Sequence, residues 1–466
     1  CIRDRVHLAK AVGFQVISTN INNDRGIAIC KAMYGYLLFG KKEILPQGTD
    51  WRQALSLWHE KPELWITPKE KDQKADHFVG EHYIQGDNAY EESDQAKADI
   101  QEMLQAWEDN EPLVRKLWKQ NNAWFYQGNR QTAQRLGIYF DQENYESDLY
   151  QEGKQIVLDN MQPQGPFFER ADGPIGIKLD KYNLPDKILI RSDGTAIYMT
   201  FDIALTKQRM QDKHYDQAVW VVGNDQKLHF EQLFAICQEI GIIQDPAQAF
   251  HLAYGMVYLP EGKMSSRKGL IIQCDDILDE MQNRAFEEVE KRYPDMSGEQ
   301  KNKLAEQISL GAIKYAILKY DSMQDITFDP EQTLSFSGDS GPYLQYVCVR
   351  IKSIIKKAAE AGLEPTSDHQ ILTGWQAHLN PSEFVLLRKL YQLPEVVIRA
   401  ALEYKPNYVC SYLFDLSQSF NDFYLACPVL KADSQTAAAR LALCQGVLQV
   451  LVNGLGLLGI EVPERM

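Results

Sequence analysis

The chain has 466 residues, of which 44% are hydrophobic and 24% are charged, the ordinary composition of a folded protein of about three domains. These values exclude an intrinsically disordered chain and a small scaffold held together by disulfides. With 49 Lys and Arg against 64 Asp and Glu, the net charge is −15. No overall positive field therefore attracts nucleic acid, and any phosphate-binding surface must be local.

The first elements in chain order predict the second half of a βαβ unit. Residues 3–12 have helical spacing that ends at Gly13, and residues 14–21 have the pattern of a buried or half-buried strand. Since such a helix follows a strand in a βαβ unit, the first strand of the sheet is expected to be missing from this sequence.

The middle of the chain predicts an α/β fold with an insertion. From about residue 45 to 165, Trp, Glu, Gln, Asp and Lys dominate long helical patterns such as 96–123, which predicts a helical insertion and no sheet layer. Strand patterns return at 175–179, 187–190, 217–223 and 250–258, and helical patterns occur at 197–210 and 229–240. This alternation favours a parallel, Rossmann-like sheet.

Residues 340–466 are expected to be helical throughout, with breaks near 362–367 and 428–434. By count, residues 341–466 carry 11 basic and 11 acidic side chains and are neutral, so the preceding residues hold the whole net charge. Arg350, Lys352, Lys356 and Lys357 gather on one predicted helix. A polyanion-binding surface and an ordinary solvated helix face are both open interpretations of this cluster.

The spacing of the cysteines and the hydropathy of the chain indicate whether a structural zinc site or a membrane span is to be expected. The eight cysteines are scattered, and no pair has the C-x₂₋₄-C spacing of a structural zinc site. We therefore expect reduced thiols, no zinc and a cytoplasmic protein. The uncharged stretch 441–460 could suggest a membrane span, but its Gln, Asn and Gly residues favour a core helix followed by a turn, so no membrane association is expected.

The strongest local signal is the segment 261–269, EGKMSSRKG, which follows a predicted strand and has glycines near both ends. Its three cations and two hydroxyls can wrap a polyphosphate and offset the charge that moves onto pyrophosphate as it leaves. An exposed basic turn is the alternative. Because open α/β sheets bind ligands at the carboxyl ends of their strands, the position of the segment favours the functional interpretation.

KMSSRKG resembles the KMSKS loop of class I aminoacyl-tRNA synthetases in the variant found in arginyl-tRNA synthetases, although its fourth position is Ser266 in place of lysine. Other segments are similar to the same family and occur in family order. They are INNDRGIAICK at 21–31, RSDGT at 191–195 followed by Tyr198 and Asp202, GNDQKLHF at 223–230, GPYLQY at 341–346 and PERM at the end of the chain. The ordered set is far more specific than any single segment.

The resemblance implies a Rossmann-like catalytic domain in two parts, 1–44 and 166–340, a helical insertion at 45–165 and an α-helical anticodon-binding domain at 341–466. It implies ATP-dependent ligation of L-arginine to tRNA(Arg) through an arginyl-adenylate, with Mg²⁺ accompanying ATP. The expected partners are tRNA(Arg), L-arginine and ATP, and the protein is expected to be a monomer.

Tyr198 and Asp202 are four residues apart, so they project from one face of a predicted helix. A carboxylate is the partner that a guanidinium needs, because two parallel N–H···O bonds supply both charge and planar geometry, and a tyrosine can stack on the same group. A pair on a helix surface is the ordinary alternative. The resemblance implies that both residues bind arginine and that Gln226 completes the pocket.

The resemblance implies three further sets of site residues. At the ATP end of the cleft they are Gly223, Asp225, His229, Met256, Val257 and Lys263. In the loop, the expected catalytic residues are Lys263, Ser265, Ser266, Arg267 and Lys268. The expected tRNA-binding residues are Tyr346, Arg350, Lys352, Lys356 and Lys357. A helix-terminal histidine satisfied by backbone is the alternative for His229, and simple sheet core is the alternative for Met256 and Val257.

Class I synthetases carry a His-x-Gly-His signature on the first strand–helix turn, and none of the nine histidines fits it. The segment from His77 to His82 contains the residue types of the signature at the wrong spacing, and it lies inside the predicted insertion. The chain is therefore expected to be N-terminally truncated, which leaves a non-catalytic tRNA-binding fragment or paralogue open as an alternative. A different class I synthetase, such as the cysteinyl enzyme, is a second alternative, disfavoured by Asp202 and by the absence of clustered cysteines.

Overall fold

The computed structural model describes residues 2–43, 45–46, 48–260 and 273–466, and its contacts form two compact units. Unit 1 consists of Cys1–Ser18, Gln217–Glu231 and Ala247–Met466. Unit 2 consists of Thr19–Asp216 and Gln232–Pro246. Each unit therefore combines segments that are far apart in the sequence.

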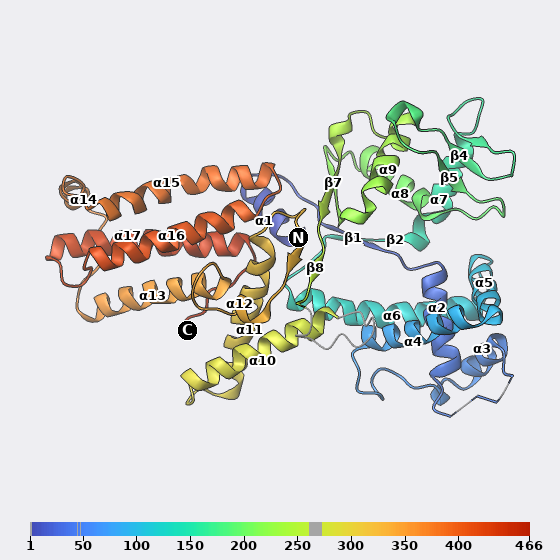
Figure 1. Cartoon of the computed structure of the whole chain (residues 1–466), viewed down its shortest axis with the longest axis horizontal. Helices are drawn as coiled ribbons and strands as arrows, with labels where there is room; N and C mark the ends of the chain where they lie inside the picture. Colours follow the sequence, from blue (N-terminus) through green and yellow to red (C-terminus); the bar gives the residue numbers. More distant parts are fainter. Residues whose placement is uncertain (1, 44, 47, 261–272) are drawn as a thin grey trace. The chain divides into compact units, whose positions relative to one another are not determined.

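A helical bundle forms the carboxyl-terminal part of unit 1 (Figure 1, orange to red). Its helices are α13 (Gly341–Glu360), α14 (His369–Gln376), α15 (Pro381–Leu402), α16 (Asn407–Ala426) and α17 (Ser434–Leu457). One hydrophobic core joins them, with Leu344, Leu413 and Phe420 among its fully buried side chains. Polar side chains cap four of these helices, because Ser340, Asp368, Asn380 and Asp433 each accept a backbone N–H bond in the first turn.

Within the described residues, α17 is the one helix long and apolar enough to cross a membrane by length and composition, which is weak evidence for a span. Its buried residues, including Leu441, Val447 and Leu451, belong to the bundle core. Beyond the helix, Gly459 adopts a left-handed conformation with φ 68°. The predicted core helix followed by a turn is confirmed.

Unit 1 also contains two pairs of parallel strands. β6 (Ala218–Gly223) pairs with β7 (Ala249–Tyr254), and β8 (Val257–Tyr258) pairs with β9 (Ile326–Thr327). The 3₁₀ turn η4 (Asn224–Gln226) and helix α9 (Lys227–Glu239) connect β6 to β7, which is the parallel crossover expected of a Rossmann-like sheet. Helix α9 is divided between the units, since its residues from Gln232 onward belong to unit 2. Unit 1 also contains the helices α1 (Ile2–Ala11), α10 (Cys274–Arg292), α11 (Gly298–Leu318) and α12 (Pro330–Thr333).

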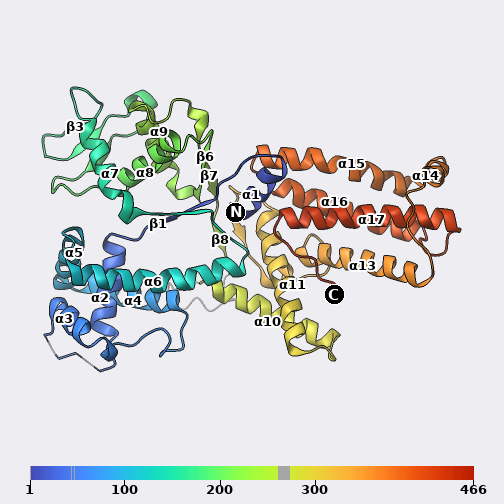
Figure 2. The ribbon, with the colours of Figure 1, turned by 180° about the vertical axis from the view of Figure 1, so that it is seen from behind.

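Unit 2 begins with a helical group in which α2, α4 and α6 lie side by side (Figure 2). Its helices are α2 (Ile27–Phe39), α3 (Trp51–Glu60), α4 (Ala75–Glu92), α5 (Asp94–Glu108) and α6 (Pro112–Arg135). Helices α2 and α4 approach closely at Gly35 and Gly86. A Cβ atom on either glycine would lie 1.9 Å from a backbone carbonyl oxygen of the other helix, so no larger residue fits.

The rest of unit 2 carries the strand β1 and the paired helices α7 and α8. β1 (Thr19–Asn22) pairs in parallel with β2 (Gln142–Tyr145), and α7 (Glu146–Asp159) begins directly after β2. Helix α7 packs against α8 (Tyr198–Lys207). β3 (Phe168–Glu169), β4 (Ile175–Ile177) and β5 (Lys187–Ile190) form an antiparallel sheet.

Several predicted elements differ from the observed ones. The strand predicted at 14–21 is only β1, and Phe14 and Ile17 are exposed. The helix predicted over 96–123 is interrupted after Glu108, because Asn110 has φ 60° and Pro112 starts a new helix. The run at 250–258 divides into β7 and β8.

Two differences concern the sheets themselves. The insertion predicted to lack a sheet layer contains β2, whose residues Gln142–Tyr145 show no hydrophobic alternation and gave no strand pattern. The strands near 175 and 187 form an antiparallel hairpin, in place of part of a parallel sheet. The domain boundaries given above stay predictions.

Candidate functional site

The two residues expected to bind arginine occupy the open face of α8 in unit 2. Tyr198 begins the helix and is 50% exposed, and Asp202 lies one turn later and is partly buried. All other residues from Met199 to Thr206 are buried. The four-residue spacing therefore places the phenol and the carboxylate on the same exposed strip of an otherwise buried helix, as predicted.

A glycine contact sets the position of α8. A Cβ atom added to Gly153 of α7 would lie 2.1 Å from the carbonyl oxygen of Thr200 and 3.1 Å from the backbone nitrogen of Phe201. Lys154, the next residue of α7, donates a hydrogen bond of 2.8 Å to the carbonyl of Gly194 in the segment before α8. Helix α7 thus fixes the backbone that carries Tyr198 and Asp202.

Replacing Gly153 with alanine is expected to lower the melting temperature and to raise the KM for arginine. The new methyl group forces α8 away from α7, and overpacking of this kind costs about 1–3 kcal/mol. Thermal denaturation and arginine titration measure the two effects. Gly80→Ala is the matched control, because Gly80 lies within α4 with nothing within 4 Å of an added Cβ, and it should be neutral or slightly stabilising.

Asp202 lies within Coulombic range of a buried arginine that the sequence did not single out. Arg209 belongs to a π-helical turn (Gln208–Asp212) that continues α8, and it is 7% exposed. Its Nη2 donates a 2.9 Å hydrogen bond to the hydroxyl of Thr19. Burial lowers the pKa of Arg209 to about 10, while the negative charge of Asp202 acts in the opposite direction.

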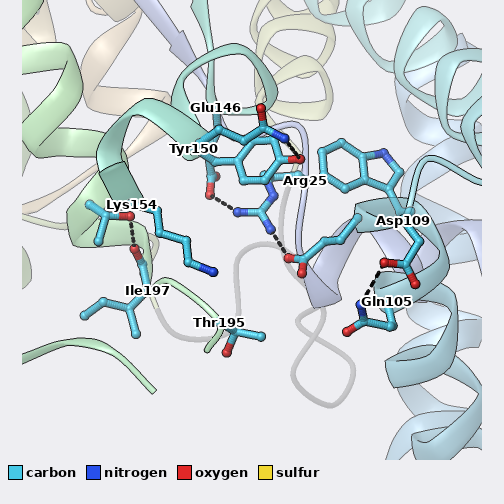
Figure 3. Close-up of polar contacts among 12 residues, drawn as sticks. Arg25, Gln105, Asp109, Glu146, Tyr150, Lys154, Thr195 and Ile197 are labelled. Carbon is cyan, nitrogen blue, oxygen red and sulfur yellow. Dashed lines mark hydrogen bonds and ion pairs between the residues drawn. The ribbon is translucent and has the colours of Figure 1, made fainter. Parts of the chain in front are cut away.

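A second arginine, Arg25, is partly buried and contacts Glu146, the first residue of α7 (Figure 3). The guanidinium of Arg25 forms ion pairs with Glu108 and with Glu146, the latter at 3.8 Å, and lies over the ring of Tyr150 at 4.3 Å. Burial raises the pKa of Glu146. The hydrogen bond from Asn23 and the charge of Arg25 oppose that shift, and the negative charges of Asp24 and Asp202 add to it.

Asp24, in the segment 21–31, connects that segment to the first turn of α7. Asp24 is 4% exposed, and its carboxylate accepts bonds from the N–H and the hydroxyl of Ser147 at 2.9 and 2.7 Å. Burial raises the pKa of Asp24. The sequence resemblance included this segment but gave no role to Asp24, Arg25 or Glu146, since their partners are far away in the sequence.

A cleft of about 290 Å³ adjoins these residues in unit 2. Trp118, Tyr126 and Tyr145 contribute aromatic rings to it, and Asp24 and Asp148 contribute carboxylates. The hydroxyl of Tyr126 is buried without a hydrogen-bond partner. None of the predicted site residues lines this cleft.

In unit 1, four predicted residues gather where β6 ends and α9 begins. Gly223 is the last residue of β6, and Asp225 and Gln226 form the turn that follows, with the Gln226 amide donating to the Asp225 carboxylate at 3.0 Å. His229 lies in the first turn of α9 and is 8% exposed, with its ring edge against Phe230. The carboxyl end of a parallel strand and the following helix N-terminus are the usual place for a phosphate-bearing ligand.

Met256 and Val257 are exposed by 55% and 49%, so the alternative that they are sheet core is wrong. The Met256 N–H donates to the Asp325 carboxylate at 2.7 Å, and its carbonyl accepts from Ile326 N–H at 3.0 Å. The protein itself therefore uses the backbone groups of Met256, and the side chains of Met256 and Val257 form an exposed apolar surface. Lys263, Ser265, Ser266, Arg267 and Lys268 lie outside the described residues.

The four predicted cations lie together on α13, as expected, but their surroundings differ. Arg350 lies over the rings of Tyr346 at 5.4 Å and Tyr424 at 5.7 Å. Lys352 forms an ion pair of 2.7 Å with Glu464. Lys356 and Lys357 are exposed and, in the part of the chain that the structure describes, make no ion pair. These two lysines are the exposed cations of the cluster.

Comparisons with known proteins identify the class to which this fold belongs. Residues 67–330 match the family of class I (R) tRNA synthetase catalytic domains, and residues 344–466 match the DALR anticodon binding domain. The arginyl-tRNA synthetase of Thermus thermophilus has a similar structure, with a TM-score of 0.74 and 26% identity, covering 100% of this chain and 86% of that one. The fold and the site thus define a class I aminoacyl-tRNA synthetase with a helical anticodon-binding domain.

Curated relatives narrow the class to one family. The arginine–tRNA ligase of Bacteroides thetaiotaomicron is 35% identical over 99% of this chain and 76% of its own length. That of Treponema denticola is 36% identical over 98% of this chain and 74% of its own length. The chain belongs to the arginyl-tRNA synthetase family. The predicted family and fold class are confirmed, and the alternative of a cysteinyl-type synthetase is wrong.

Proposed function

We propose that this chain ligates L-arginine to tRNA(Arg), using ATP and passing through an arginyl-adenylate. The arginine assignment depends on the position of Asp202, which is the one carboxylate on the open face of α8. A carboxylate accepts the two parallel N–H bonds of a guanidinium, which combines charge with planar geometry. Tyr198 offers its ring to the same group, and Gln226 is assigned to the same amino acid by resemblance.

The first half-reaction joins the arginine carboxylate to the α-phosphate of ATP, and pyrophosphate leaves. Little covalent work falls to side chains, so orientation and electrostatics supply the rate. We assign Gly223, Asp225, His229, Met256, Val257 and Lys263 to ATP, and Lys263, Ser265, Ser266, Arg267 and Lys268 to stabilising the departing pyrophosphate. Mg²⁺ would accompany ATP, held largely by phosphate oxygens and water, and we assign no zinc.

In the second half-reaction, a hydroxyl of the terminal ribose of tRNA(Arg) attacks the arginyl carbonyl, and AMP leaves. We assign the basic face of α13 to the tRNA, with Tyr346, Arg350, Lys352, Lys356 and Lys357 as its candidate residues. Since the carboxyl-terminal segment is neutral and the whole chain carries −15, this attraction has to be local. We also propose a cytoplasmic monomer without membrane association.

Arginine-dependent ATP–pyrophosphate exchange in the presence of tRNA(Arg) tests the proposal. Exchange is expected with arginine and not with other amino acids. A chain that binds tRNA(Arg) but gives no exchange with arginine would contradict the enzymatic assignment and favour the non-catalytic tRNA-binding alternative. Size-exclusion chromatography with light scattering tests the monomer.

The double variant Lys356→Ala/Lys357→Ala is expected to weaken tRNA(Arg) binding and to reduce its salt dependence. Each lysine lost from a phosphate contact lowers the slope of log K against log salt by about 1. Filter binding at several salt concentrations measures the slope. Lys431→Ala removes another exposed lysine from the same domain and should leave the slope unchanged; an unchanged slope in the double variant itself would remove this surface from the assignment.

A further inference from the structure

The turn between α15 and α16 (residues 403–406) carries a tyrosine where helix ends usually carry glycine. Tyr404 has φ 56° and donates its N–H to the Ala401 carbonyl at 3.3 Å. The next N–H, that of Lys405, donates to the Ala400 carbonyl at 2.9 Å, which completes the usual pair of bonds at such a helix end. A residue with a Cβ atom is strained in this left-handed conformation, and such strain persists only where other contacts hold the residue.

The side chain of Tyr404 contacts the parallel strands of unit 1. Its ring stacks on Phe250 of β7, with the ring centroids 5.4 Å apart and the planes at 20°. Its hydroxyl donates to the side-chain oxygen of Gln217, the residue before β6, at 2.5 Å. The amide of Gln217 donates in turn to the Ala247 carbonyl at 2.9 Å. Glycine would make neither contact of the tyrosine side chain, so these contacts account for a tyrosine at the strained position.

The next residue, Lys405, joins the same turn to a second part of unit 1. Its Nζ lies 3.0 Å from Oδ2 of Asp321, in the segment that follows α11. The other oxygen of that carboxylate, Oδ1, accepts the N–H of Met323 at 3.1 Å. Lys405 belongs to the anticodon-binding domain and Asp321 to the catalytic domain, so the ion pair connects the two domains.

The turn 321–325 is in close contact with Gly255, the residue before Met256. The Gly255 N–H donates to the Ser322 carbonyl at 2.7 Å. A Cβ atom on Gly255 would lie 2.6 Å from the carbonyl carbon and oxygen of Gln324, so no larger residue fits. The turn therefore determines where the backbone just before Met256 lies.

Met256 and the strand β8 that follows it are held by the same segment. The Met256 N–H donates to the Asp325 carboxylate at 2.7 Å, and β8 pairs with β9 directly after the turn. The placement of Met256 and Val257 thus depends on the turn 321–325, which is bound in turn by Lys405.

We propose that Tyr404 and Lys405 are positioning residues for ATP, through which the anticodon-binding domain sets the place of Met256 and Val257. This inference rests on the proposed function, in which Met256 and Val257 bind ATP. Tyr404 acts on the strands β6 and β7, and Lys405 acts on the turn that contacts the backbone after β7. Neither side chain touches ATP in this arrangement. Since adenylate formation depends on orientation, a small shift of this segment is sufficient to change it.

Substitutions on both sides of the ion pair separate its charge from the fold. Lys405→Met removes the charge and keeps the length of the side chain, and Lys405→Arg keeps the charge. Asp321→Asn removes the charge and keeps the oxygen that the turn requires. Tyr404→Asn keeps a residue type that tolerates positive φ and removes the stacked ring. Lys389→Met is the matched control, because Lys389 of α15 forms its ion pair with Asp415 of the same domain, at 3.7 Å.

ATP–pyrophosphate exchange with arginine and tRNA(Arg) present gives kcat and the KM values for ATP and arginine. Lys405→Met and Asp321→Asn are each expected to raise the ATP KM about three- to fivefold, the effect of a partly exposed ion pair, with the arginine KM and the tRNA(Arg) affinity unchanged. The double variant should be no worse than either single variant, because both remove the same interaction. Lys405→Arg should remain near wild type, Tyr404→Asn should raise the ATP KM, and Lys389→Met should leave it unchanged.

The outcomes distinguish this inference from the proposed function. If Met256→Ser raises the ATP KM and the Lys405 and Asp321 variants do not, the ATP assignment stands and the positioning role is overturned. If the double variant shows the sum of the two single effects, the ion pair is not their cause, and the inference fails. It fails again if the ATP KM, the arginine KM and kcat all change together with a fall in melting temperature, because the role is then structural only. If Met256→Ser leaves the ATP KM unchanged, the ATP assignment itself fails.

Discussion

Replacing Asp202 with asparagine is expected to weaken arginine recognition by about 2–5 kcal/mol, a rise in the arginine KM of about 30-fold to several thousand-fold. The substrate guanidinium loses its counter-charge, and the amide cannot accept two parallel charge-assisted bonds. Steady-state kinetics at varied arginine and saturating ATP measure the effect.

Two comparisons make this result specific. Asp212→Asn removes an exposed carboxylate at the end of the same segment and should leave the arginine KM unchanged. Citrulline, the neutral analogue of arginine, should be rejected by the wild-type protein and discriminated less strongly by the Asp202 variant, since the lost term is the attraction between opposite charges. An arginine KM equal to wild type in Asp202→Asn would remove the pocket assignment.

The part of this site that the sequence predicts is the part governed by local periodicity. Tyr198 and Asp202 share a helix face because of the 3.6-residue repeat, and the structure places both on the only open strip of α8. The same reasoning grouped Arg350 with Lys356 on α13. Spacing alone could not show that Glu464, at the other end of the domain sequence, neutralises Lys352.

The part that the sequence does not predict depends on contacts between distant segments. Arg25 meets Glu146 only after β1 pairs with β2, and Arg209 meets Thr19 only when the turn that continues α8 reaches the first residue of β1. Neither arginine has a distinctive neighbour in the sequence. A glycine is likewise required at position 153 because the carbonyl oxygen of Thr200, on a separate helix, leaves no room for a Cβ atom. Buried charge pairs and close helix contacts of this kind are tertiary properties.

The fold, like the site, was predictable where local sequence patterns determine the structure. Helices with strong amphipathic patterns occur close to their predicted positions, as do β6 and the crossover helix α9. The prediction failed where the hydrophobic pattern of a segment does not match its pairing in a sheet. The residues of β2 are polar and form a strand because β1 offers an edge, whereas Phe14 and Ile17 are apolar and remain outside any strand.

Replacing Lys263 or Lys268 with alanine is expected to lower the rate of arginyl-adenylate formation by about 10²–10³-fold, with little change in arginine affinity. These lysines belong to the KMSSRKG segment, whose cations are assigned to the pyrophosphate group. Charge accumulates on that group as the bond to the α-phosphate breaks, so the interaction is stronger in the transition state than in the ground state. Such a loss appears in kcat, while the KM for arginine stays near its wild-type value.

Arginine-dependent ATP–pyrophosphate exchange at saturating arginine measures this step directly, because the incorporation of pyrophosphate into ATP does not depend on transfer of arginine to tRNA. Lys303→Ala removes an exposed cation from α11 and should leave the exchange rate unchanged, which separates a local effect from a general change in net charge. The segment has Ser266 where the KMSKS sequence has lysine, so its positive charge resides in Lys263, Arg267 and Lys268. Exchange at the wild-type rate in both lysine variants would show that these cations do not act on the leaving group.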